Sequence, residues 1–190
     1  MTEAKEKKYA IEIEQDTSGA MNDPRETHDN VGTMACWHLR YDLGDEQPEE
    51  SLGKYLLKLD SEALVLPLHL YAHSGLTMRT TPFASNWDSG KVGIIWVSQA
   101  DIDKEWAGDR EKAKSYLEGE VATYDLYLRG EVWAFYIFEE CTCCGQNKPG
   151  SVDSCHGHLG EDIDCIKDSI PSGYVTDAQI QEAWDNRGNC

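Results

Sequence analysis

Two short apolar stretches flank a long segment of helical periodicity in the middle of the chain. The stretches 92–97 and 131–138 are rich in β-branched and aromatic residues, as buried strands are. Between them, apolar residues recur at steps of three and four, which places them on one face of a helix: Ala113, Leu117, Val121, Tyr124 and Leu128. The pattern therefore predicts a strand, a long helix over about 99–129 that covers the sheet, and a second strand.

Both ends of the predicted helix carry boundary residues. Ser98 and Asp101 have the spacing of a capping box, in which side chains satisfy the free backbone N–H groups of the first turn. Gly130 follows the last apolar position, where a glycine in the left-handed conformation often ends a helix. Gly108 is a weak point within the segment.

Shorter elements are predicted on both sides of this centre. Residues 8–14 alternate between apolar and polar positions and indicate a half-buried strand. The other predicted elements are strands at 33–39 and 63–71 and helices at 49–59 and 176–184. Pro67 cannot donate to a β-ladder, so its strand is expected at a sheet edge or a bulge. The order is neither regular βαβ alternation nor all-β, and the predicted class is α+β with a mixed or antiparallel sheet.

A change of composition near residue 140 suggests two parts. Residues 1–140 hold most of the predicted strands and the long helix, and we expect them to form an α+β core domain. Residues 141–190 begin with a segment rich in Cys, Gly and His and end in a predicted helix. We expect this second part to be a small zinc-binding annex.

The cysteine spacing is the strongest chemical signal in the chain. Cys141, Cys144, Cys155 and His158 follow the pattern C-x2-C-x10-C-x2-H, which offers four ligands for a tetrahedral structural zinc. The alternatives are reduced, unligated thiols on a loop and a disulfide. Further candidate ligands are nearby: Cys143, His156 and Cys165. A closed four-ligand site leaves no position for a substrate, so the predicted zinc would hold a loop together and would not make an enzyme.

Catalytic signatures are weak. The sequence contains no P-loop, no G-x-G-x-x-G after a strand and no H-E-x-x-H. Cys36 and His38 lie on one face of a predicted strand, but no third residue orients them, and a packed cysteine beside a surface histidine is the simpler interpretation. An enzyme that uses His38, His69 or His73 with the long predicted loop 72–90 is the least favoured hypothesis. We therefore predict no catalytic residues and no cofactor-binding residues apart from the metal ligands.

The charge is strongly negative. Thirty-five acids and 17 bases give a net charge of −18, which argues against binding to duplex nucleic acid. The acids are concentrated in residues 1–60, with 14 acids and 7 bases, and in residues 131–190, with 11 and 3. Two interpretations remain: a solvated surface that keeps the protein soluble, or an acidic face for a basic partner. The candidate partner-binding residues are Asp42, Asp45, Glu46, Glu49, Glu50, Glu161, Asp162 and Asp164.

Signals for a membrane or for secretion are missing from the pattern. No apolar run approaches the roughly 20 residues that span a bilayer, and residues 1–8 are not followed by an apolar segment. The expected location is the cytoplasm.

Several segments resemble a family of uncharacterised proteins encoded by bacteriophages and prophages. The similarity begins at Asp29-Asn-Val-Gly-Thr-Met-Ala-Cys-Trp-His-Leu-Arg-Tyr-Asp-Leu-Gly-Asp45. It continues through 66–75, 80–83, 87–93 and 120–136 and ends in the cysteine segments 141–145 and 153–157. The resemblance implies an accessory phage protein made inside a bacterial cell, and by analogy an inhibitor of host defence of the anti-CRISPR or anti-restriction type.

Two functions follow as hypotheses. The first is an acidic, non-enzymatic protein that binds a basic surface of a host defence complex and inhibits that complex. In one version of this hypothesis the protein mimics nucleic acid. The alternative is a zinc-stapled phage protein with a regulatory or nucleic-acid-associated role. Binding to free DNA at physiological salt would favour the second.

Overall fold

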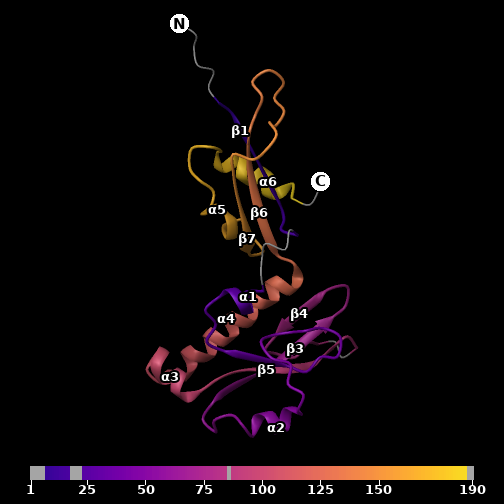
Figure 1. The fold of residues 1–190 in the computed structure, drawn as a ribbon, viewed down its shortest axis with the longest axis vertical. Helices are drawn as coiled ribbons and strands as arrows, with labels where there is room; N and C mark the ends of the chain where they lie inside the picture. Colours follow the sequence, from indigo (N-terminus) through magenta and orange to yellow (C-terminus); the bar gives the residue numbers. More distant parts are fainter. Residues whose placement is uncertain (1–6, 18–22, 85–86, 188–190) are drawn as a thin grey trace. The chain divides into compact units, whose positions relative to one another are not determined.

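Two compact units make up the chain (Figure 1). The computed structural model describes residues 7–17, 23–84 and 87–187. Unit 1 comprises Met1–Met21 and Gly130–Cys190, and unit 2 is the continuous segment Asn22–Arg129. This division replaces the boundary expected at residue 140, because a strand near the beginning of the chain pairs with the strand that follows Gly130.

Unit 2 contains a four-stranded antiparallel sheet and four helices within its described residues. The strand order is β2-β5-β3-β4. In chain order the elements are α1 (Pro24–Thr27), β2 (Thr33–Cys36), α2 (Leu52–Leu56), β3 (Leu64–Ala72), β4 (Leu76–Arg79), β5 (Ser89–Val97), α3 (Gln99–Trp106) and α4 (Arg110–Arg129).

The main core of unit 2 joins helix and strand side chains. Leu117 and Val121 of α4 are buried in one cluster with Leu68 and Ile95 of the sheet. The contact is close at Gly32, where an added Cβ would lie 2.4 Å from Leu117 Cδ2 and 2.9 Å from Ile95. A larger residue here would force the side chains of Leu117 and Ile95 to move.

A second, smaller cluster lies under α2. It contains the buried residues Ala35, Tyr55 and Ile94, with Trp37 and Trp96 packed against them. Since Ala35 and Ile94 alternate along their strands with residues of the main core, this cluster occupies the opposite face of the sheet.

Unit 1 contains a three-stranded antiparallel sheet in the order β1-β6-β7. Its elements are β1 (Tyr9–Gln15), β6 (Val132–Glu139), β7 (Asp153–Leu159), α5 (Asp164–Lys167) and α6 (Asp177–Asp185). Phe135 and Ile137 of the central strand are buried with Ile13 of β1 and Trp184 of α6. Thr176 and Gln179 form a capping box that starts α6.

The α+β class is confirmed, and both sheets are antiparallel. The single helix expected over 99–129 is instead two helices, because Ala107 and Gly108 adopt left-handed backbone conformations with φ of 52° and 84°. The Ser98 cap is present, with its hydroxyl accepting a hydrogen bond from the Asp101 N–H at 3.1 Å. Gly130 has the expected positive φ, 74°.

The two strands predicted to flank the helix belong to different sheets. β5 lies in unit 2 and β6 in unit 1, so the strand-helix-strand segment is not a single layered core. Among the described residues no helix is both long enough and apolar enough to cross a bilayer.

Candidate functional site

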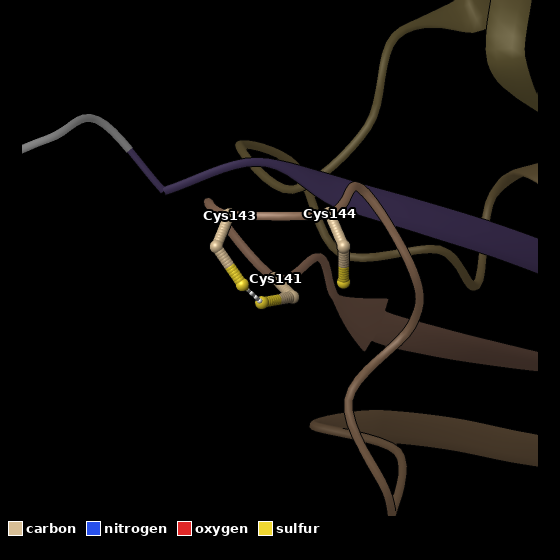
Figure 2. A group of neighbouring side chains, drawn as sticks. All are labelled: Cys141, Cys143 and Cys144. Carbon is tan, nitrogen blue, oxygen red and sulfur yellow. Dashed lines mark hydrogen bonds between the residues drawn. The ribbon is translucent and has the colours of Figure 1, made fainter.

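Three cysteines form a cluster in the turn that follows β6. The sulfur atoms of Cys141, Cys143 and Cys144 all lie within 4.8 Å of one another. The sulfurs of Cys141 and Cys143 are 2.7 Å apart and face each other (Figure 2). Cys143 and Cys144 are exposed and Cys141 is half-buried. We call residues 141–145 the thiol turn.

Backbone hydrogen bonds close the thiol turn independently of its sulfurs. The Cys141 N–H donates to the Gln146 carbonyl and the Gly145 N–H donates to the Cys141 carbonyl, both at 2.8 Å. Gly145 has a φ of 73°, a backbone conformation that residues other than glycine rarely adopt. Next to the turn, Lys148 Nζ lies 2.6 Å from a carboxylate oxygen of Glu139.

The environment of Cys141 favours its thiolate form. Hydrogen bonds from the Cys143 thiol and then from backbone N–H groups of Cys143 and Cys144 lower the pKa of Cys141 to about 6. The pKa of Cys143 is raised, first of all by its hydrogen bond to Cys141. Since the thiolate is the form that binds metals, the cluster can hold a metal ion.

The sequence-predicted ligand set is only half assembled. Cys141 and Cys144 lie together, but Cys155 and His158 are in β7, opposite Phe135 and Trp133 of β6. These partners precede Cys141 by six and eight residues, or about 20 and 26 Å along a strand. The third sulfur of the cluster comes from Cys143, which the spacing pattern had offered only as a further candidate.

The two histidines of β7 have other surroundings. The ring of His158 stacks beside Phe135 at 6.0 Å between centroids, and burial lowers the pKa of the imidazole. His156 Nδ1 lies 3.7 Å from the buried carboxylate of Asp16. In the described part of the chain all the cysteines, including Cys165, are free thiols.

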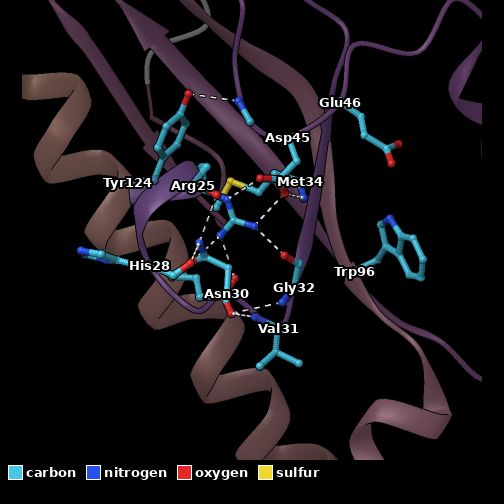
Figure 3. Close-up of polar contacts among 12 residues, drawn as sticks. Arg25, His28, Asn30, Val31, Gly32, Met34, Asp45, Glu46, Trp96 and Tyr124 are labelled. Atoms are coloured by element: carbon cyan, nitrogen blue, oxygen red, sulfur yellow. Dashed lines mark hydrogen bonds and ion pairs between the residues drawn. The ribbon is translucent and has the colours of Figure 1, made fainter. Parts of the chain in front are cut away.

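The first group of predicted partner-binding acids lies on the loop between β2 and α2 in unit 2. The Asp45 carboxylate is engaged within the unit, because it is 2.7 Å from Arg25 NH2 and accepts the Met34 N–H at 2.6 Å. Figure 3 shows the Arg25 guanidinium surrounded by oxygen atoms. Its side chain is only 2% exposed and is also paired with Glu120 at 2.8 Å. This network was not predicted from the sequence, which has no local signal for it.

The rest of this loop presents carboxylates on a fixed backbone. Glu46 accepts a hydrogen bond from the Tyr55 hydroxyl at 2.7 Å, and its carbonyl accepts the Cys36 N–H at 2.9 Å. The indole of Trp37 donates to the Glu50 carbonyl at 2.6 Å. A surface pocket is lined by Glu46, Gln47, Pro48, Glu49, Glu50 and Tyr55. We call residues 42–50 the acidic loop; its Asp42 and Glu49 are exposed.

The second group of acids belongs to unit 1. Glu161, Asp162 and Asp164 are exposed and lie just before and at the start of α5. The Asp162 carboxylate accepts the Asp164 N–H at 3.2 Å, as in a turn. The two acidic groups are therefore carried by different units.

The residues considered for catalysis make contacts typical of structural residues. Burial raises the pKa of the Cys36 thiol to about 12, which disfavours a nucleophilic thiolate. His38 stacks on Tyr41, and its Nδ1 accepts the Tyr41 N–H at 3.1 Å. His73 lies 3.1 Å from Asp88 at the exposed end of the sheet, while His69 lies between Arg79 and Lys91 on neighbouring strands.

No family model, no curated protein and no solved structure matches this chain.

Proposed function

We propose that this protein is a non-enzymatic inhibitor that binds a basic surface of a host defence complex through its acidic loop. The observation that supports this best is that hydrogen bonds hold the backbone of residues 46–50, which carries three glutamates, in one position. A carboxylate on an ordered loop loses less conformational freedom on binding than one on a flexible segment. Lys58 already pairs with the Glu50 carboxylate, so Glu46 and Glu49 are the acids of this pocket that would accept a partner's lysine or arginine side chain.

The anchoring of the loop gives this proposal its physical basis. Tyr55 and Trp37 hold the loop from the sheet side, and the Trp96 indole donates to the Tyr55 hydroxyl at 3.2 Å. Arg25 and Asp45 hold its other end. The loop backbone is thus restrained from both sides while Glu49 stays exposed.

The proposed setting is an infected bacterial cytoplasm. The resemblance to phage proteins supports it, and anti-CRISPR and anti-restriction proteins are the analogous classes. The net charge of −18 supports a basic partner, including a nucleic-acid-binding protein whose groove would be blocked.

The test is a pull-down from a defence-carrying host, followed by binding measurements with the captured complex. The double substitution Glu49→Lys and Glu50→Lys should weaken binding by about tenfold or more, mainly through slower association. Raising the salt concentration should weaken wild-type binding, because the screening length falls from about 8 Å at physiological ionic strength to about 3 Å at 1 M.

A matched control separates the loop from the overall charge. Glu111→Lys with Glu118→Lys makes the same change of charge at two exposed positions of α4 and should leave binding nearly unchanged. Inhibition that survives reversal of the acidic loop, or a captured partner without a basic surface, would show the proposal to be wrong.

The thiol turn favours a second candidate function, a zinc-stapled protein with a regulatory or nucleic-acid-associated role. Zinc is the ion we propose for it, because thiolates are its usual structural ligands. DNA binding by the zinc-loaded protein at physiological salt would favour this role over the first, since a free acidic inhibitor should not bind DNA.

A further inference from the structure

We propose that Cys141, Cys143 and Cys144 together hold one zinc ion in an open three-thiolate site, without Cys155 or His158. The inference rests on the proposed zinc and specifies its ligands. It also changes the expected role of the metal, from a staple required for folding to an accessible ion on the surface.

The spacing of the three sulfurs suits a single ion. A zinc–sulfur bond of about 2.3 Å places tetrahedral sulfur ligands about 3.8 Å apart. The sulfurs of Cys141 and Cys143 are 2.7 Å apart, and all three lie within 4.8 Å. Shifts of about 1 Å at exposed side chains would bring them into position, whereas Cys155 and His158 would require the register of β6 and β7 to change.

The charge of the site is partly balanced by a neighbouring lysine. Three thiolates and one Zn²⁺ carry a net charge of −1. Lys148 lies close enough to Cys141 for the sulfur's charge to act on it, and its side chain is 46% exposed while it pairs with Glu139. This cation is three residues from the end of the turn.

An open site follows from the exposure of the turn. Cys143 and Cys144 are exposed, so solvent can reach the metal and a water molecule can complete a tetrahedral set. The backbone of the turn is closed by its own hydrogen bonds and by the bridge between Glu140 and Asn147. The unit should therefore keep its fold without the ion, and a chelator should remove the ion readily.

The experiment measures zinc in the reduced full-length protein and in single variants. Wild type should hold about one zinc per chain, and Cys141→Ser, Cys143→Ser and Cys144→Ser should each lose most of it. Cys155→Ser and His158→Ala are the matched controls and should keep it. Cobalt substitution provides a second measurement, because thiolate-to-cobalt absorption should fall in the first three variants only.

The outcomes separate this inference from the proposals on which it rests. Full zinc binding by Cys143→Ser, or loss of zinc from Cys155→Ser or His158→Ala, would overturn the proposed ligand set. Neither result would contradict the proposal that the wild-type protein binds zinc. A reduced wild type that binds no zinc would overturn the zinc proposal itself. Neither result bears on binding by the acidic loop, which is measured separately. A large fall in melting temperature on chelation would contradict the open, non-stapling site.

Discussion

Arg25 is a charged residue of unit 2 whose side chain is almost fully buried. Its side chain, 2% exposed, donates to Asp45, Glu120, Asn30 and the Gly32 carbonyl. Glu120 in turn accepts the N–H groups of Val31 and Gly32 at 2.8 and 3.1 Å. The residues before β2 are thus attached to α4 by charged hydrogen bonds in addition to apolar packing.

Replacing Arg25 should therefore be costly. Arg25→Met should lower the free energy of unfolding by about 3–5 kcal/mol, because it removes the guanidinium that pairs with the partly buried carboxylates of Asp45 and Glu120. Urea denaturation measures the change, and Lys114→Ala on the exposed side of α4 is the control. Adding Glu120→Gln should recover part of the loss; a loss as small as that of the control would mean that the network contributes little.

His69 provides a residue-scale test of electrostatics. Burial lowers the pKa of this histidine, and the positive charges of Lys91 and Arg79 on the two adjacent strands lower it further. Lys91→Glu should therefore raise the pKa of His69, as measured by NMR titration of its ring protons. Lys112→Glu, on the exposed side of α4, should not move it.

The direction of the pH effect on stability follows from the same residue. Since the folded pKa of His69 lies below its value of 6.5 in the unfolded chain, the unfolded state binds more protons. This contribution to stability is present above pH 6.5 and declines as the pH falls through the folded value. An unchanged His69 titration in Lys91→Glu would show that the two side chains do not share a face.

Among the elements, α4 links the sequence pattern to the packing. Leu117 and Val121 are buried as their spacing predicted. Leu117→Ala or Val121→Ala should lower the free energy of unfolding by about 1–4 kcal/mol, while Lys114→Ala should change it little. Thermal or urea unfolding of the three variants measures these changes. Equal effects in all three would mean that the helix is packed through another face.

The sequence predicted elements better than their partners. The apolar runs of β5 and β6 are correct as strands, and the Ser98 cap and Gly130 mark real helix boundaries. Periodicity is a local property, however, and it does not tell that β6 pairs with β1 instead of β5. For Pro67, the expected bulge is present one residue away, at Leu68 and His69, but β3 is an interior strand.

The same limitation explains why the predicted metal ligands do not all lie together. The spacing of Cys141, Cys144, Cys155 and His158 suggested that two short motifs converge. Their distance in space depends on the register of β6 with β7, which places Cys155 opposite Phe135. Local spacing does identify the thiol turn, because Cys141, Cys143 and Cys144 are neighbours in sequence.

At the scale of the whole molecule, both units are acidic. Residues 22–129 contain 19 acids and 11 bases, and the remaining residues contain 16 and 6. The charge is therefore not confined to one unit, and each unit has a hydrophobic core of its own.

A continuous unit with its own core should fold alone. A polypeptide of residues 22–129 should be soluble, show cooperative urea unfolding and retain the Arg25 network, because that network involves only residues of unit 2. Circular dichroism and the effect of Arg25→Met in the isolated segment are the measurements. Non-cooperative unfolding of the segment would show that the two units depend on each other for stability.

Unit 1 is interrupted by unit 2, and this has a consequence for the chain as it leaves the ribosome. Gln15, the last residue of β1, is made 117 positions before Val132, the first residue of its partner strand. At a synthesis rate of about 5–20 residues per second, β1 waits roughly 6–23 s for β6. During that time Ile11 and Ile13 have no sheet to join, while residues 22–129 can already collapse around their own core. In a nascent chain that stalls before residue 130, residues 22–129 could therefore be folded while β1 is still unpaired. An unpaired strand is prone to bind chaperones or the strand edges of other proteins.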